Sequence, residues 1–417
     1  MGSYTGLQWN AQSGHSLPGL SAFPQNEMAR RRIATGIDIG THQTKIVVVE
    51  ELRTQTGASV PRIIGTGLVP SAGMRHGYVV DPEDAAATVR AAKRQAEQAA
   101  RVPIKTAFLS IGGISLDEAR ATGACVVSRA DQEITELDIE KVLDSARMSA
   151  EPHFLNRRVL HEIPLQYRVD GHKVLGDPVG LRGTRLEADY LFITCLESHA
   201  SALIAVAEAA DIDIIDCMAS PLAGSYVTLT KDQKMKGCVL ANIGAETLSI
   251  VVYDENVPIS MKVFPAGGST ITDELALGFR VSLEDAERIK MGRLGGAMYP
   301  KKKVDDIITG RFRHMFDLID KHLRALGKRG NLPAGIIISG GASGQGQVTD
   351  IAKGSLALPS KIADMQTPPD AKIKDATWAV AFGLALWGLT GDTDTPKKNH
   401  FAGTGKSLRR FLQQFLP

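Results

Sequence analysis

The chain has 417 residues, more than one hydrophobic core usually holds, so two or more packed units are expected. Its hydrophobic fraction of 43% and charged fraction of 23% are those of an ordinary globular protein. The formal net charge of +2 excludes a global attraction to nucleic acid, and no nucleic-acid partner is expected. No apolar run reaches the roughly 18 residues that span a membrane, and no signal peptide is recognisable, so the sequence predicts a cytoplasmic protein.

The spacing of cysteine and histidine gives no sign of a metal site. The four cysteines form no C-x-x-C pair, and the ten histidines form no H-E-x-x-H pair. These are the spacings typical of redox and zinc sites. We interpret the cysteines as buried, reduced side chains.

Strand and helix signals alternate in the first part of the chain. Residues 1–32 are rich in Gly, Ser, Gln, Asn and Pro without periodicity, which predicts a disordered tail. Residues 33–50 read as a strand, a glycine turn and a second strand dense in β-branched residues. Asp81 and Pro82 supply an N-cap and a first-turn proline for a helix that ends near Arg101.

Residues 116–188 differ in character, because two extended segments flank one amphipathic helix; we interpret them as a small α+β unit inserted into the fold. A weak two-fold echo relates the hairpin near residue 37 to another near residue 241. The other predicted elements are strands at 62–71 and 106–113, a strand–helix–strand at 189–219, two strands at 238–254, mixed short strands and helices at 258–330, a buried strand at 334–344 and an apolar helix at 375–389.

The turn at residues 36–45 is the first candidate site. A turn between two strands presents backbone N–H groups to one concavity, which suits a phosphate. Gly40 allows close approach of the backbone, Lys45 brings a positive charge, and Asp38 at the strand end suits hydrated magnesium. The structural alternative is a plain turn with Lys45 as an exposed edge charge.

Two further glycine turns follow the same logic. Residues 239–254 repeat the order of strand, glycine turn and strand, and Gly340 and Gly341 end a buried strand. A double glycine leaves room for a flat ring or a sugar against the main chain. Each turn is a weak signal, but the three in this order are together much stronger.

This order of turns resembles the phosphate-1, phosphate-2 and adenosine motifs of the actin/Hsp70/sugar-kinase superfamily. Within it the chain resembles the FtsA family of bacterial cell division proteins from Ile33 to Pro417. Characteristic segments are VLHEIPLQYRVDG, DPVGLRG, LEADY, SPLAGSYVTLT, PAGGSTITDELA and DAERIKMGRLG. The resemblance implies an α/β, actin-like (ribonuclease H-like) fold of two lobes with an inserted α+β 1C subdomain and a C-terminal amphipathic helix.

The implied organisation divides each lobe into subdomains. The boundaries are 33–115 and 189–218 with the final helix 375–390 (1A), 116–188 (1C), 219–257 and 330–374 (2A), 258–329 (2B), 391–405 (linker) and 406–417 (amphipathic helix). By the same resemblance, nucleotide would be bound by Asp38, Gly40, Thr41, His42, Gln43, Lys45, Asn242, Gly244, Ala245, Glu246, Thr247, Gly267, Gly268, Glu284, Glu287, Lys290, Gly340, Gly341 and Ala342, with Asp38 holding Mg²⁺ through water.

The helix that carries Glu284, Glu287 and Lys290 has two interpretations. The resemblance implies that Glu287 and Lys290 contact a ribose, and gives Glu284 a lesser claim. Their spacing at i, i+3 and i+6 equally fits an ordinary solvated helix face.

The second turn departs from the superfamily pattern D-I-G-G-G-T-T-D. Asn242 stands where the pattern has its first acid, and Ser249 where it has its last. An amide offers no full negative charge to a metal or an attacking water, and Glu246 adds negative charge near the expected phosphates. We therefore hypothesise nucleotide binding with weak or no ATPase activity, and assign no catalytic residue.

The C-terminal segment has the pattern of an amphipathic helix. Its apolar residues recur at i, i+3, i+4, i+7 and i+8, with basic residues beside them. Such a helix suits the surface of an anionic bilayer, and the alternative is a helix docked on its own core. The predicted membrane-binding residues are Lys406, Leu408, Arg409, Arg410, Phe411, Leu412, Phe415 and Leu416.

The resemblance implies an ATP- and Mg²⁺-binding protein that forms actin-like filaments with itself. It would sit peripherally on the cytoplasmic face of the inner membrane at the septum, binding anionic lipid. Its implied partners are the C-terminal peptide of FtsZ, reached through the 2B surface, and later proteins of the divisome. The alternatives are an actin-fold assembly adaptor of the PilM type and a small-molecule kinase of the same superfamily, the latter disfavoured by Asn242 and Ser249.

Overall fold

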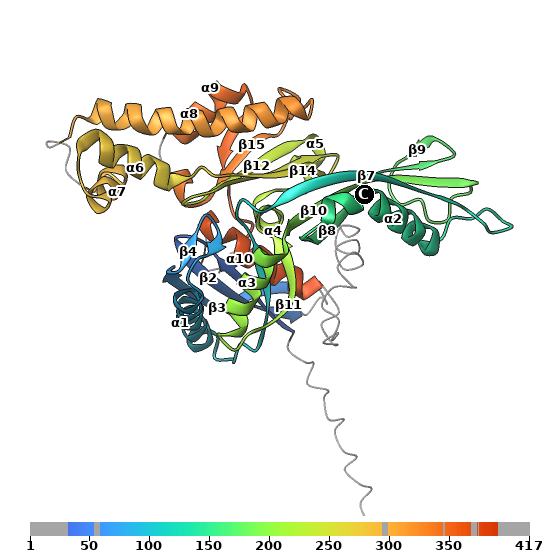
Figure 1. Ribbon diagram of the computed structural model, residues 1–417, viewed down its shortest axis with the longest axis horizontal. Helices are drawn as coiled ribbons and strands as arrows, with labels where there is room; N and C mark the ends of the chain where they lie inside the picture. Colours follow the sequence, from blue (N-terminus) through green and yellow to red (C-terminus); the bar gives the residue numbers. More distant parts are fainter. Residues whose placement is uncertain are drawn as a thin grey trace, which may run out of the picture. The chain divides into compact units, whose positions relative to one another are not determined.

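The computed structural model describes residues 32–53, 59–293, 299–344, 347–367, 373 and 375–390. Within these ranges the chain forms two five-stranded sheets, a four-stranded sheet and a short hairpin (Figure 1). The predicted tail at 1–32 (apart from Arg32), the linker at 391–405 and the amphipathic helix at 406–417 lie outside the described residues.

The first five-stranded sheet has the order β11-β6-β1-β2-β3. Its strands are β1 (Ile33–Ile39), β2 (Gln43–Arg53), β3 (Ser59–Pro70), β6 (Thr106–Ile111) and β11 (Asp213–Ala219). β1, β2 and β3 are antiparallel neighbours, whereas β6 and β11 run parallel to β1. The predicted strand–turn–strand at 33–50 is confirmed, with β1 and β2 paired along their length.

Both faces of this sheet are covered by helices, namely α1 (Pro82–Ala100) and α3 (Glu197–Glu208) on one side and α10 (Ala379–Thr390) on the other. In β2, Ile46 and Val48 pack in the core that contains α1, while Val47 and Val49 pack against α10. Side chains of a strand alternate between faces, so a sheet covered twice favours the uninterrupted apolar run seen here. Each buried side chain contributes about 1.5–3 kcal/mol.

The helix predicted from Asp81 is confirmed as α1. The Asp81 carboxylate accepts hydrogen bonds from the backbone N–H groups of Glu83 and Asp84 at 3.0 and 3.1 Å. These are donors that a first helical turn otherwise leaves unpaired. Ahead of α1, a tight hairpin joins β4 (Met74–Arg75) to β5 (Tyr78–Val79).

The second five-stranded sheet repeats the pattern of the first, in the order β14-β13-β12-β15-β16. Its strands are β12 (Cys238–Ile243), β13 (Leu248–Asp254), β14 (Val257–Phe264), β15 (Gly335–Ser339) and β16 (Ser360–Ile362). β12, β13 and β14 are antiparallel neighbours, and β15 and β16 run parallel to β12. The two-fold echo in the sequence therefore corresponds to two sheets of the same topology.

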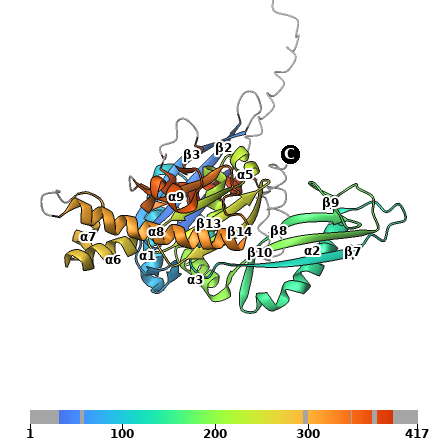
Figure 2. The ribbon, with the colours of Figure 1, turned by 90° about the horizontal axis from the view of Figure 1, so that it is seen from above.

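Helices of the second half share one hydrophobic core with this sheet, and α6 and α7 lie beside the N-terminal half of α8 (Figures 1 and 2). They are α6 (Gly268–Phe279), α7 (Leu283–Lys290), α8 (Lys301–Ala325) and α9 (Val348–Leu356). The shorter elements are α5 (Lys231–Lys236), η2 (Gly341–Gly344) and η3 (Ala376–Trp378).

Helix α4 (Ser220–Thr228) contacts strands of both five-stranded sheets. It packs closely against α10, because a Cβ atom on Gly383 would lie 1.9 Å from the carbonyl oxygen of Ala223. Only a glycine admits that approach. The pair α4 and α10 therefore joins the two sheets in one continuous core.

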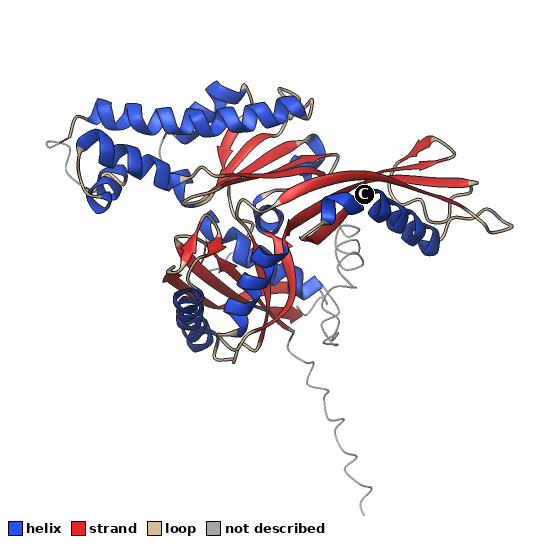
Figure 3. Cartoon of the chain, viewed as in Figure 1, coloured by secondary structure: helices blue, strands red, loops and turns tan. Residues whose placement is uncertain are grey.

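The inserted unit is a four-stranded sheet, β7-β10-β8-β9, with α2 packed on one face (Figure 3). Its elements are β7 (Asp117–Val126), α2 (Glu136–Ala150), η1 (Glu151–Phe154), β8 (Arg157–Val169), β9 (His172–Val174) and β10 (Arg185–Leu196). The predicted helix between two extended segments is confirmed. β10 pairs with β7 and β8 along its whole length, although the predicted boundary at residue 188 falls inside it.

Candidate functional site

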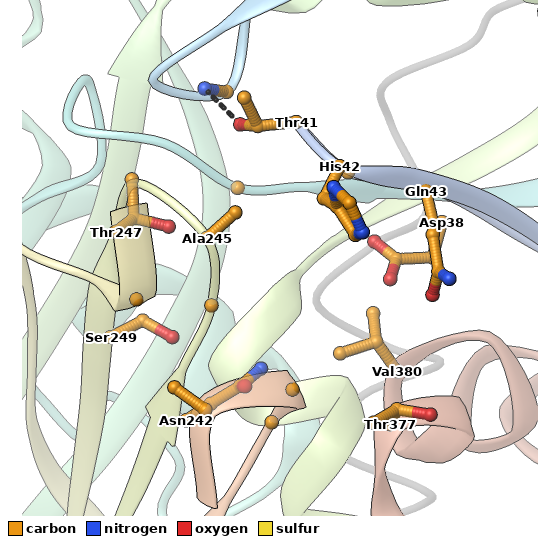
Figure 4. Close-up of a pocket in the computed structure, with 18 of the residues that line it drawn as sticks. Asp38, Thr41, His42, Gln43, Asn242, Ala245, Thr247, Ser249, Thr377 and Val380 are labelled. Carbon is orange, nitrogen blue, oxygen red and sulfur yellow. Dashed lines mark hydrogen bonds between the residues drawn. The ribbon is translucent and has the colours of Figure 1, made fainter. Parts of the chain in front are cut away.

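A cavity of about 420 Å³ lies where the two five-stranded sheets meet. On one side it is lined from the carboxyl ends of the parallel strands β1 and β6, and on the other from those of β12 and β15. In Figure 4, Asp38, His42 and Gln43 lie across the cavity from Asn242, Ala245 and Thr247. Open α/β sheets bind ligands at the carboxyl ends of their strands, so this is the candidate site.

The first glycine turn carries a charge pair into the cavity. Asp38 and Lys45 are paired residues of the β1–β2 hairpin, and the Ser110 hydroxyl of β6 donates a hydrogen bond to Asp38 at 2.8 Å. Burial raises the pKa of Asp38 and lowers the pKa of Lys45, while the attraction between the two charges opposes both shifts. Lys45 is buried and faces the cavity, so the alternative of an exposed edge charge is wrong.

The second glycine turn is held against the first turn of α6. Its own N–H at Gly244 donates to the carbonyl of Thr247 at 2.8 Å. The N–H groups of Gly268 and Ser269 donate to the carbonyls of Gly244 and Ala245 at 2.9 and 2.7 Å. The turn is therefore fixed to α6, a helix whose N-terminal residues Gly268 and Ser269 line the same cavity.

Helix α7 contributes an ion pair at one wall. The Lys290 ammonium lies 2.5 Å from Glu287 and donates to the hydroxyl of Thr272 at 2.8 Å and to the carbonyl of Gly268 at 3.2 Å. Burial opposes ionisation of Glu287, but Lys290 and the Thr272 hydroxyl outweigh it and lower the pKa of Glu287. Both side chains contact α6, and the Lys290 side chain is only 10% exposed whereas that of Glu287 is 47% exposed.

The double glycine after β15 forms the floor of the cavity. Gly340 has a φ of +93°, and a Cβ atom there would lie 2.3 Å from Oδ1 of Asn242 and 2.4 Å from the carbonyl oxygen of Ile243. A Cβ atom on Gly341 would meet nothing within 4 Å. The first glycine is thus required by the turn, and the second leaves open space.

Most of the predicted nucleotide-binding residues come together at this cavity. Those that line it are Asp38, Gly40, Thr41, His42, Gln43, Lys45, Asn242, Gly244, Ala245, Thr247, Gly268, Glu287, Lys290, Gly340, Gly341 and Ala342. Ser249, the second departure from the superfamily pattern, also lines it and pairs with Asn242 in the β12–β13 hairpin.

Three predicted residues are not among the lining side chains. Gly267 instead lets α6 approach the second turn, since a Cβ atom there would lie 2.4 Å from the carbonyl oxygen of Ala245. Glu284 is exposed and forms an ion pair with Arg288 at 2.6 Å. Glu246 accepts a hydrogen bond from the backbone N–H of His76 at 2.5 Å, so its charge is directed at the β4–β5 hairpin rather than into the cavity.

Several residues that line the cavity belong to no sequence motif and were not predicted from the sequence. They include Gly77, Ser110, Gly112, Gly113, Ser220, Ser269, Met291, Asp375, Thr377 and Val380. A signal did exist for some of them, because Ser110 lies near the carboxyl end of β6 and Ser220 directly follows β11. The carboxyl ends of these parallel strands meet that of β1. Asp375 accepts a hydrogen bond from the N–H of Thr377 at 2.9 Å, which is the N-cap pattern ahead of an apolar helix.

The described residues hold no group of three or more His, Cys, Asp or Glu side chains placed to bind a metal ion. Among the helices that the structure describes, none has the length and apolar character to cross a membrane. The four cysteines are free thiols, and three of them are buried, as expected.

Two sheets of one topology facing a common cleft, with a further α/β unit inserted in the first half, define an actin-like protein. Solved structures of similar fold support this class. The PilM–PilN type IV pilus biogenesis complex has a chain that superposes with a TM-score of 0.65 at 17% identity, covering 86% of this chain and 99% of that one. The ethanolamine utilization protein EutJ of Carboxydothermus hydrogenoformans gives a TM-score of 0.50 at 15% identity, covering 85% and 90%.

Sequence comparison identifies the family within this class. Residues 120–194 match the model of the SHS2 domain inserted in FtsA, and residues 239–383 match the model of the cell division protein FtsA. FtsA of Bacillus subtilis is 30% identical over 379 residues, covering 86% of this chain and 83% of that protein. FtsA of Pseudomonas aeruginosa is 27% identical over 389 residues, covering 87% and 91%. The chain belongs to the FtsA family of cell division proteins.

Proposed function

We propose that this protein binds ATP with Mg²⁺ in the cleft and tethers the FtsZ ring to the cytoplasmic face of the membrane at the division septum. One observation carries the nucleotide site: the glycine turns of both sheets converge on a cavity of about 420 Å³, within the usual range for small-molecule sites. Equilibrium binding of a fluorescent ATP analogue tests it. Lys45→Ala is expected to weaken binding at least tenfold, because it removes the buried ammonium.

The residues present fit a magnesium nucleotide. Lys45 and the residues of the first turn line the space proposed for the phosphates, and Glu287 and Lys290 line the space proposed for the ribose. Magnesium is commonly held by one or two carboxylates together with phosphate oxygens, and Asp38 supplies such a carboxylate through water. When bound, the cation would neutralise phosphate charge.

The cleft is poorly equipped to activate water. Asn242 and Ser249 face each other across the β12–β13 hairpin and line the cavity where the superfamily pattern has acids. We therefore propose weak or no ATP hydrolysis. A steady-state phosphate-release assay at saturating ATP measures it, and Asn242→Asp is expected to raise the rate. Robust turnover by the unmodified protein would contradict this part of the proposal.

Membrane attachment is proposed from the sequence pattern of residues 406–417. A single short amphipathic helix binds a bilayer weakly, so stable attachment would depend on several copies in a filament. Liposome co-sedimentation compares the full chain with one ending at Gly405, on anionic and neutral lipid, with and without ATP. Pelleting of the full chain alone, enhanced by anionic lipid, supports the tether. Equal behaviour of the two chains refutes it.

The FtsZ peptide is proposed to bind a hollow between α6 and α8. Glu274 of α6 lines it with Lys303, Ile307 and Arg311 of α8, so it offers apolar contact and charges of both signs. Leu277 stands nearby on α6 with 80% of its surface exposed. Leu277→Ser is expected to weaken binding of the FtsZ C-terminal peptide in fluorescence anisotropy. Leu155→Ser is the matched control, because that leucine is 78% exposed on the inserted unit.

Self-assembly and the alternative functions are tested together. ATP-dependent filaments in electron microscopy, with contacts to later division proteins through the inserted unit, are expected for the tether. A coupled assay with small metabolites tests the kinase alternative. A pull-down with the FtsZ peptide separates the tether from a PilM-type adaptor, since only the tether is expected to retain it.

A further inference from the structure

The β4–β5 hairpin touches both phosphate-side turns of the cleft. At its tip, His76 and Gly77 have φ values of 49° and 84°, so two neighbouring N–H groups lie at the hairpin's end. The Gly77 N–H donates to the hydroxyl of Thr41 in the first turn at 3.1 Å, drawn as a dashed line in Figure 4. The His76 N–H donates to the carboxylate of Glu246 in the second turn at 2.5 Å.

The hairpin is fixed to the first half of the molecule. The carbonyl of Gly77 accepts a hydrogen bond from Nε2 of His199 in α3 at 2.9 Å, and Nδ1 of His199 accepts one from the Ser115 hydroxyl. The ring of Tyr78 stacks on that of His199 with centroids 4.4 Å apart. Because burial lowers the pKa of His199, the neutral ring that this pattern needs is favoured. The hairpin therefore moves with the first sheet.

Glu246 belongs to the opposite half and is equally well fixed. The preceding carbonyls of Gly244 and Ala245 accept hydrogen bonds from the first turn of α6. The Glu246 side chain is 25% exposed, and the same carboxylate oxygen lies 3.7 Å from Nδ1 of His76. A carboxylate accepting a backbone N–H is among the stronger hydrogen bonds of proteins. This contact consequently joins the two halves across the cleft.

We propose that Glu246 is a strap across the cleft that slows its opening and thereby slows nucleotide exchange. This deepens the proposed ATP site and rests on it for the exchange step, whereas the strap itself requires no nucleotide. Breaking it frees the two turns to separate. Entry and release of nucleotide should then accelerate together, with a smaller change in equilibrium affinity.

The first test is hydrogen exchange of the His76 amide in the absence of nucleotide. Glu246→Ala should speed its exchange at least tenfold, the loss expected for one charge-assisted hydrogen bond. Glu246→Gln, which keeps a neutral acceptor, should give an intermediate effect. Glu284→Ala is the matched control, because that exposed glutamate forms its ion pair with Arg288 of the same helix, α7. Unchanged protection in Glu246→Ala overturns the strap.

The second test is the release rate of a fluorescent ATP analogue chased with unlabelled ATP. Glu246→Ala should release it about tenfold faster, with normal thermal unfolding. If Glu246→Ala releases the analogue faster but leaves hydrogen exchange of the His76 amide unchanged, the strap is overturned. Loss of the Glu246 negative charge near the nucleotide would then explain the faster release. Lost protection with unchanged release overturns its role in exchange. If the unmodified protein binds no ATP, the proposed function fails, while hydrogen exchange still decides the strap.

Discussion

The adjacent residues Gly340 and Gly341 allow a sharp test of how the second half of the cleft is built. In Gly340→Ala, a φ of +93° disfavours any L side chain, at about 1–2 kcal/mol. The added Cβ would also lie 2.3 Å from Asn242 and 2.4 Å from Ile243, and relieving such overlap costs about 1–3 kcal/mol. The expected loss is therefore about 2–5 kcal/mol, a fall in Tm of about 2–6 °C for a chain of this length.

Gly341→Ala is the control, because its Cβ meets nothing within 4 Å and its φ is not in the left-handed region. Thermal unfolding should be nearly unchanged, while a new methyl group on this cavity-lining residue should weaken binding of the ATP analogue. Calorimetry and ligand titration of both variants give the comparison. Equal stability of the two variants would refute the assignment of Gly340 as a strained, crowded turn residue.

Three further outcomes follow from buried or capping groups. Burial lowers the pKa of His161 from 6.5 to about 3, so acid protonates only the unfolded state over that interval. The free energy of unfolding should fall by about 1.4 kcal/mol for each pH unit as pH is lowered from about 6 to 4. The fall should be smaller in His161→Gln, and urea unfolding measures both. Burial raises the pKa of Asp216 to about 7. The free energy of unfolding should therefore fall as pH rises from about 4 to 7, because only the unfolded state loses the proton over that interval. Asp216→Asn should stabilise the protein at pH 8 by about 1–3 kcal/mol but little at pH 4. Lys93 donates to the carbonyls of Ala210 and Asp211 after α3 at 3.1 and 2.9 Å, so Lys93→Ala should cost about 1 kcal/mol, unlike Arg94→Ala on the exposed side of the same helix.

Local chemistry made several elements predictable. Asp81 and Pro82 indicate the start of α1. The Asp81 side chain accepts hydrogen bonds from free N–H groups of the first turn, and Pro82 has a φ already suited to a helix, so both effects are local. The run Ile46–Val49 indicates a strand that is covered on both faces of its sheet, and the glycine turns indicate close approach of the backbone. These signals depend on neighbours in sequence, so they survive without knowledge of the tertiary structure.

The side-chain directions at the cleft were not predictable in the same way. Glu284 and Glu287 lie three positions apart on one helix, and the family resemblance offered both as ribose contacts, with Glu287 preferred. In the fold, Thr272 of α6 meets Glu287, whereas Glu284 turns toward Arg288 and solvent. Similarly, Glu246 was expected beside the phosphates, but the distant N–H of His76 offers its carboxylate a better partner.

The sequence by itself determined the order of the three glycine turns, the inserted unit and the loss of acids at Asn242 and Ser249. Only the tertiary structure decided which other residues complete the cleft. Ser110, Ser220 and Asp375 lie far apart in the chain and carry no motif, yet parallel strands and the N-cap of η3 bring them to one cavity. The physical reason is that strand order and helix packing, set by burial of many apolar side chains at once, fix which strand ends meet.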